Sequence, residues 1–169
     1  MALGPAYPEI TAVLPVGSMT RHFSQVSNAA NSSITVANVP KVLPLNGDGA
    51  NNAAYNNSGG RGTPDFVNDW WDVRGLHPSS GLDFRVTVGN NGAGQVNNAN
   101  IGVRLIPSIA NPGVYIDNPS VDVNFKGQAQ FFVTAYHGGI EAVQVTIRTA
   151  SGENIRHYGS YLDIDNVAN

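Results

Sequence analysis

Apolar and polar residues alternate one by one through most of the second half of the chain. Between positions 82 and 88 every even position is apolar, whereas Asp83, Arg85 and Thr87 occupy the odd positions. Successive side chains of a β-strand point to opposite faces, so this alternation is typical of a strand with one buried face. The sequence predicts five such antiparallel strands, the other four carrying Ile101, Val103 and Leu105; Val121, Val123 and Phe125; Ala129, Phe131, Val133 and Ala135; and Val143, Val145 and Ile147.

The first half of the chain is less regular. Pro44 cannot donate a backbone hydrogen bond, so a strand around it has to be an edge strand or no strand. The glycines at 138 and 139 fit a tight hairpin over 137–139. Further elements are predicted at 10–16 and 33–39 (strands), 41–45 (an edge strand or none), 66–73 (a strand or a helical turn) and 156–164 (the last strand).

The fold class follows from this pattern and from the scarcity of helix formers. The chain has two Met, two Lys and three Glu, and no window repeats apolar residues at helical spacing. We therefore predict an all-β protein, an antiparallel β-sandwich or jelly-roll barrel of about eight strands with little or no helix. Residues 1–169 are expected to form one domain, with an extended N-terminal arm at 1–9 and a long Asn/Gly-rich loop at 46–64.

Composition excludes several functional classes. Only 12% of the residues are charged and the formal net charge is −3, so no basic excess exists for specific binding of nucleic acid. The absence of cysteine excludes disulfides and Cys-ligated metal centres. No run of about 18 apolar residues predicts a membrane-spanning helix. The residues after Met1 form neither the basic nor the apolar region of a secretory leader, so we expect the chain not to be a secreted precursor.

Catalytic and metal-binding signatures are weak. No nucleophile elbow, phosphate-binding loop or His-Glu-x-x-His motif occurs. The histidines at 22, 77, 137 and 157 have polar or turn-forming neighbours and are expected in loops or at the surface. Carboxylates within 46–52, at 117 and 122, and at 163 and 165 have the chemistry to bind a hard cation, but each set is expected to be solvated. We therefore predict no catalytic residue, no metal and no cofactor.

Trp70 and Trp71 stand between Asp69 and Asp72. Carboxylates beside aromatic rings are found in sugar-binding and glycosidase sites. Neighbouring strand residues face opposite ways, so we expect one tryptophan to be inward and the other to mark an interface.

A weakly charged surface is desolvated at a lower cost than a charged one, which suits packing against other subunits. Seven of the nine basic residues are Arg, which forms well-desolvated bidentate pairs more readily than Lys does. Prolines at the N-terminus favour an extended arm. The candidate assembly residues are Pro5, Pro8, Tyr55, Arg61, Trp70 and Trp71.

The sequence resembles two known families, one through a segment and one through the layout of the whole chain. The segment 127–147, with its Gly-Gln-Ala-Gln-Phe-Phe-Val strand and the alternating strand after it, is similar to bacterial immunoglobulin-like domains of adhesins. The layout of the whole chain, with a Met start, few charges, an irregular arm and about eight strands, resembles single-jelly-roll capsid proteins of icosahedral bacteriophages, including those with an internal membrane. That resemblance implies assembly into a shell through the barrel flanks and terminal arms.

Our first hypothesis is therefore a structural virion protein, a capsid subunit that self-assembles into a viral shell. Its partners would be copies of itself, forming a homo-oligomer, other capsid proteins, and an internal membrane where the virion has one. The alternative is an immunoglobulin-like or carbohydrate-binding β-sandwich module of an extracellular adhesin or enzyme, with a tryptophan as a stacking platform. A hydrolase that uses Asp69, Asp72 or another carboxylate pair is the third hypothesis. The lack of a leader favours the first over the second.

Overall fold

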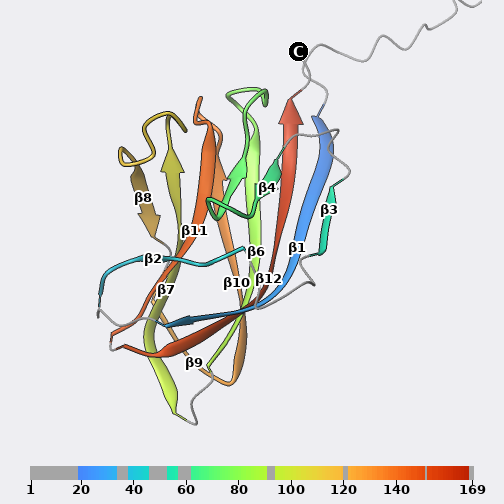
Figure 1. Cartoon of the computed structure of the whole chain (residues 1–169). Helices are drawn as coiled ribbons and strands as arrows, with labels where there is room; N and C mark the ends of the chain where they lie inside the picture. The colour runs from blue at the N-terminus through green and yellow to red at the C-terminus, as the bar shows by residue number, and fades with distance from the viewer. Residues whose placement is uncertain are drawn as a thin grey trace, which may run out of the picture.

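The computed structural model describes residues 19–33, 38–45, 53–56, 62–90, 94–119, 122–150 and 152–167, and for 19–33, 53–56 and 166–167 it describes the backbone alone. The predicted arm at 1–9 and the predicted strand at 10–16 lie outside these residues. Within them every element is a β-strand, every strand pairing is antiparallel, and no helix occurs that could span a membrane. The prediction of an all-β antiparallel sandwich is thus confirmed (Figure 1).

The strands form two sheets that face each other. The first sheet has the order β10-β6-β12-β1-β3, and the second has the order β4-β5-β11-β7-β8, with β2 paired to β11 and β9 paired to β7. The strands are β1 (Met19–Ser33), β2 (Lys41–Val42), β3 (Ala53–Asn56), β4 (Thr63–Asp65), β5 (Trp70–Asp72), β6 (Gly81–Asn90), β7 (Gln95–Ile106), β8 (Ile116–Pro119), β9 (Val123–Lys126), β10 (Gln128–Tyr136), β11 (Ala142–Arg148) and β12 (Asn154–Val167).

The strand order is that of a jelly roll. Strands pair from the outside of the chain inwards, as β1 with β12, β5 with β11, β6 with β10, and β7 with β8. The chain crosses from one sheet to the other at several connections, among them those between β5 and β6, β6 and β7, β10 and β11, and β11 and β12. This nested pairing is what results when one long antiparallel hairpin is wrapped into two packed sheets.

The two longest strands bend where their registers shift. The β1–β12 register shifts between Ser27 and Ala30, and the β6–β12 register shifts between His157 and Gly159. An extra residue in one strand of a pair bends that strand and increases its twist. Figure 1 shows β1 and β12 curving together at the lower end of the sandwich, so that their far ends run beneath it.

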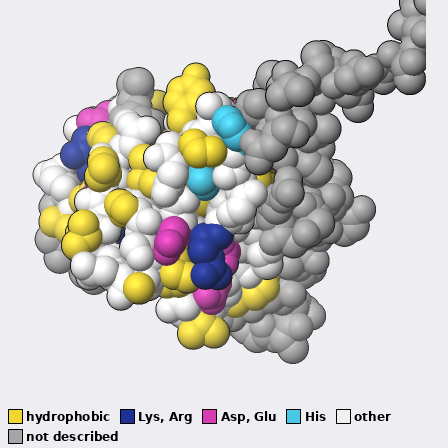
Figure 2. Space-filling view, turned by 90° about the horizontal axis from the view of Figure 1, so that it is seen from above, with side chains coloured by type: hydrophobic (Ala, Val, Ile, Leu, Met, Phe, Trp, Pro, Cys, Tyr) yellow, Lys and Arg dark blue, Asp and Glu magenta, His cyan; other side chains and the backbone are white. Residues whose placement is uncertain are grey.

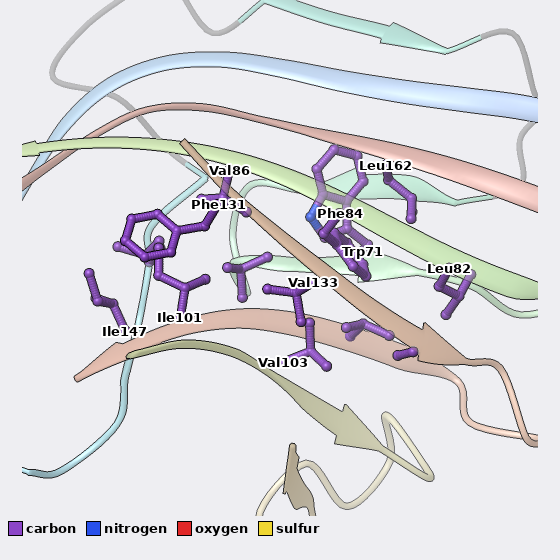
Figure 3. Packing of buried hydrophobic residues seen from close by; sticks show 14 of the residues in the cluster. Trp71, Leu82, Phe84, Val86, Ile101, Val103, Phe131, Val133, Ile147 and Leu162 are labelled. Atoms are coloured by element: carbon purple, nitrogen blue, oxygen red, sulfur yellow. The ribbon is translucent and has the colours of Figure 1, made fainter. Parts of the chain in front are cut away.

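The core lies between the sheets and follows the predicted alternation. Leu82, Val86 and Val88 of β6 are fully buried, and Phe131 and Val133 of β10 point into the same space (Figure 3). Trp71 meets Phe84 edge to face, with 6.2 Å between the ring centroids. Such aromatic pairs stabilise a core beyond the area that they bury.

Several expectations about local structure are wrong. The link at 137–139 is not a tight hairpin, because β10 and β11 belong to different sheets and the link crosses between them. Residues 34–37 of the predicted strand at 33–39 lie outside the described residues, and its predicted end is wrong, because Asn38 sits in a turn with φ of 62°. The long loop at 46–64 is interrupted by β3 and ends inside β4. Val123 of β9 is exposed instead of inward, and Val121 of the same predicted strand lies outside the described residues.

Candidate functional site

Neither tryptophan provides a surface platform. Trp71 is 0% exposed in the main core, and Trp70 is 8% exposed in a small second cluster with Ile106 and Ala142. Trp71 is the one tryptophan in the main core, as expected, but the expectation that the other marks an exposed interface is wrong. The two rings do lie on opposite faces of β5, but Ile109, in the connection after β7, packs over the outer cluster and closes that face. An exposed tryptophan therefore cannot carry sugar binding or assembly here.

The two aspartates beside the tryptophans have structural roles. Asp69 has a φ of 54°, and its Oδ1 accepts a hydrogen bond from the Leu45 N–H at 2.8 Å. Asp72 forms a bidentate pair with Arg74, with Nη2 and Oδ2 2.5 Å apart. Hydrogen bonds from Arg74 lower the pKa of Asp72 below its usual range. A carboxylate held ionised in this way is unsuited to act as a general acid, so the geometry gives no support to the hydrolase hypothesis.

Two histidines are buried. His157 lies within β12 and contradicts the prediction that all four are in loops or at the surface, whereas His137 lies in the connection between β10 and β11, as predicted, but is only 4% exposed. His157 is 0% exposed, its Nδ1 lies 2.7 Å from the Pro44 carbonyl, and its Nε2 lies 2.7 Å from Ser160 Oγ. Since a carbonyl only accepts, Nδ1 carries the proton and Nε2 accepts from the hydroxyl. His137 Nε2 likewise meets the Val73 carbonyl at 3.1 Å. Burial lowers the pKa of both imidazoles, so both are neutral supports of the fold near pH 7.

The remaining candidates do not form a common site in the described residues. Tyr55 is placed by its backbone alone, opposite Gln25 in the β1–β3 pairing. Pro5, Pro8 and Arg61 lie outside the described residues. Across the part of the chain that is described, no three His, Cys, Asp or Glu side chains come together as a metal site.

Several arginines form ion pairs within the chain. Arg104 Nε lies 2.8 Å from Asp117 Oδ1, and Arg148 Nη2 lies 3.3 Å from Asp122 Oδ1. In a view onto one end of the sandwich, the Lys and Arg side chains in sight lie beside Asp or Glu side chains (Figure 2). Much of the sparse charge is therefore neutralised locally.

A groove of about 280 Å³ lies on the outer face of the first sheet, across β10, β6 and β12. Aromatic, cationic and acidic side chains line this groove together. Most of its lining side chains alternate along the strands with the buried ones, so the same periodicity that builds the core also builds the groove. The lining residues are Asp83, Phe84, Arg85, Phe132, Val133, Thr134, Tyr161 and Asp163.

Strand register arranges the groove in two rows. In the first row Phe132 lies opposite Arg85, and Arg85 lies opposite Tyr161. The Arg85 guanidinium carbon is 5.4 Å from the Phe132 ring centroid and 5.6 Å from the Tyr161 centroid, so the cation lies between two rings. Because neighbouring strands are about 4.8 Å apart, the two rings are separated by roughly 10 Å across the sheet.

The second row holds the acidic groups. Thr134 lies opposite Asp83, and Asp83 lies opposite Asp163. This row is two residues further along the strands, roughly 7 Å from the first. Phe132 is 67% exposed. A large apolar side chain is not expected at a solvated position of a sheet, because its exposure to water is unfavourable. An exposed ring beside a guanidinium and two carboxylates combines apolar contact with hydrogen bonding in a small area.

Sequence reasoning placed Asp83, Arg85 and Thr87 on the outer face and did so correctly. It missed the groove because Phe132 and Tyr161 were not weighed as exposed aromatics. The available signal was the outward position of Phe132 in an alternating strand, between the inward residues Phe131 and Val133.

Comparisons with known proteins add little beyond the fold. No protein-family model and no curated protein sequence matches the chain. Among solved structures, dimeric latent PorU from Porphyromonas gingivalis is similar with a TM-score of 0.46 and 7% identity, over 88% of this chain and 13% of that one.

The CBM22-1–GH10 modules of the Clostridium thermocellum xylanase 10B, complexed with xylohexaose, give a TM-score of 0.39 and 13% identity, over 89% of this chain and 29% of that one. This chain thus spans less than a third of either structure. At these values the likenesses do not bear on function.

Proposed function

We propose that this β-sandwich is a carbohydrate-binding module whose ligand lies in the groove across β10, β6 and β12. The observation that carries the proposal is the cross-strand row in which Arg85 stands between the rings of Phe132 and Tyr161. The proposed ligand site is therefore this groove and not Trp70 or Trp71, which are buried.

Each groove residue offers an interaction that a sugar can use. The rings of Phe132 and Tyr161 present flat apolar surfaces for the C–H face of a pyranose. The guanidinium of Arg85 donates hydrogen bonds only, and the carboxylates of Asp83 and Asp163 accept them, so sugar hydroxyls can pair with both kinds of group. The groove volume of about 280 Å³ is near the lower end for ligand sites, which suits one or two sugar rings of an open chain.

The rigid sheet supports the site. Arg85 is held between two rings before any ligand arrives, so its side chain loses little further freedom on binding. Phe84 and Val133, which line the floor, belong to the buried core and fix the strands beneath the groove.

The test is binding of the full chain to uncharged oligosaccharides, by calorimetry on a panel of cello-, xylo-, manno- and chito-oligosaccharides. We expect at least one to bind and Tyr161→Ala to weaken that binding at least fivefold. Tyr115→Ala is the matched control, because Tyr115 also lies over an arginine, at 3.7 Å from Arg104, but on the second sheet. Equal losses in the two variants, or no binding by the native chain, would contradict the proposal.

A second candidate function is self-assembly as a capsid subunit. One observation favours it: Val114, Tyr115 and Ile116 are all exposed at the start of β8, which is the edge strand of the second sheet. An exposed apolar edge strand is a template for pairing with another chain. The partners would then be copies of this chain and other capsid proteins in a virion, with an internal membrane where one is present.

Light scattering behind a sizing column tests this candidate. Self-assembly predicts a defined oligomer that Ile116→Lys reduces in mass, because a charge at an edge strand opposes pairing. A monomer at low and at high salt would contradict it. In both candidate functions the protein binds and does not catalyse.

A further inference from the structure

We propose that the site binds a linear oligosaccharide that is longer than the groove and runs along β10 from Phe132 to Tyr136. This inference rests on the proposed function and specifies the length and the direction of its ligand. It comes from the spacing of two exposed aromatic rings on one face of one strand.

Phe132 and Tyr136 are the most exposed aromatic residues among the side chains that the structure describes. Phe132 is 67% exposed and Tyr136 is 73% exposed. They are four residues apart in β10, so both project from its outer face, about 13 Å from each other along the strand. Two flat apolar surfaces in line on one strand are able to contact different units of one extended sugar chain.

The groove itself holds only part of such a chain. Its volume of about 280 Å³ suits one or two sugar rings, and its lining includes Phe132 and Thr134 but not Tyr136. The next units of a longer ligand therefore lie beyond the groove. On the path toward Tyr136 they pass Thr134, whose hydroxyl is able both to donate and to accept a hydrogen bond.

The strand end that carries Tyr136 is suited to receive these units. In the register Tyr136 lies opposite Gly81 of β6, which has no side chain to stand beside the ring. The backbone is fixed there, because the His137 N–H donates a hydrogen bond to the Ser80 carbonyl at 2.9 Å. A ring on a fixed backbone loses less freedom when a ligand binds than a ring on a mobile loop does.

The other end of the same face offers less to a sugar. Gln130 Nε2 donates to Thr87 Oγ1 at 3.5 Å, so these two polar groups bind each other. Further along, a Cβ on Gly89 would lie 2.5 Å from the ring of Tyr158, so that ring rests on the backbone of β6. Tyr158 is accordingly only 40% exposed. The ligand is therefore expected to extend past Thr134 and not past Gln130.

The experiment compares the disaccharide and the hexasaccharide of each series in the panel, by amide NMR titration of the full chain, which also measures weak binding. Tyr136→Ala should weaken binding of the hexasaccharide about five times more than it weakens binding of the disaccharide, because only the longer ligand reaches that ring. Phe132→Ala should weaken binding of both. A longer ligand also binds in more registers, so each variant is compared with the native chain on the same ligand.

Tyr158→Ala is the matched control, because it removes the same side chain at the opposite end of the same face. It should bind both ligands as the native chain does. The inference is overturned if Tyr136→Ala loses no affinity, if it loses the same factor for both ligands, or if Tyr158→Ala shows the length-dependent loss instead. The proposed function survives each of these results provided that Phe132→Ala still weakens binding. A native chain that binds neither length would overturn the proposed function and this inference with it.

Discussion

Phe131 and Phe132 are adjacent residues of β10 that face opposite ways, and this makes them a sharp test of the account. Phe131 is 8% exposed and packs edge to face against Phe125, with centroids 5.8 Å apart. Phe132 is 67% exposed and faces the groove beside Arg85. Truncating either ring removes the same atoms, so different outcomes report only where each ring points.

The expected loss of stability differs between the two. A fully buried Phe contributes up to about 3 kcal/mol, and Phe132 buries only a third of its surface, so its burial is worth about 1 kcal/mol. Its contact with the exposed Arg85 adds about 0.5–1 kcal/mol. Phe132→Ala should therefore lower the free energy of unfolding by about 1–2 kcal/mol. Phe131→Ala removes a core side chain and should cost about 3–5 kcal/mol.

The expected loss of binding is the reverse. Phe132→Ala should weaken binding of the uncharged oligosaccharide at least fivefold, as expected for an aromatic residue at the centre of a binding site. Phe131→Leu, a milder core change that keeps the chain folded, should leave affinity within about twofold. Urea unfolding and calorimetry on the same samples measure both quantities. If Phe131→Leu weakens binding as much as Phe132→Ala does, or if Phe132→Ala binds like the native chain, the proposed placement of the site is refuted.

Three further predictions follow from the buried groups. Burial holds the pKa of His157 below the 6.5 of an unfolded chain, so the unfolded state takes up a proton at a higher pH than the folded state does. The free energy of unfolding should therefore fall as the pH drops below about 6.5. An unfolding midpoint in urea that is the same at pH 5 and pH 7.5 would argue against this. Gly102→Ala places a Cβ 2.6 Å from the Asn118 carbonyl oxygen and should lower the free energy of unfolding by about 1–3 kcal/mol. Gly94→Ala is the control, because its Cβ would have no atom within 4 Å and should change that free energy little. Equal losses in the two variants would be inconsistent with the close approach of β8 to β7. Trp70→Phe should lower the melting temperature and leave oligosaccharide affinity unchanged, because the ring is 8% exposed; a large loss of affinity in a folded variant would place the ligand at β5 instead.

The sequence predicts the strands of the second half well, because there a single rule decides both conformation and burial. Where Leu82, Phe84 and Val86 alternate with polar residues, one face has to be buried, and the structure buries it. β1 escaped prediction because its sequence, Met19–Ser33, is rich in Ser, Asn and Ala and lacks that alternation. It is extended through its pairing with β12 and β3, which no local pattern encodes.

Tertiary contacts explain the remaining misses. Trp70 is buried because Ile109, in the connection after β7, packs over the outer face of β5. The alternation of apolar and polar residues within a strand does not show that another segment will cover one of its faces. His157 tolerates burial because the carbonyl of Pro44, distant in sequence, accepts a hydrogen bond from its Nδ1–H. The groove joins β6, β10 and β12 through register, so its residues become neighbours only once the jelly roll is formed.

Mapping the ligand by NMR tests the central claim most directly. An amide spectrum of the ¹⁵N-labelled chain, titrated with the best uncharged oligosaccharide of the panel, reports every backbone position at once. The account predicts that the largest shifts fall on Asp83 to Arg85 of β6, Phe132 to Thr134 of β10, and Tyr161 to Asp163 of β12. Saturable shifts centred on β8 or on the loops of the second sheet, or no shifts with any oligosaccharide, would contradict it.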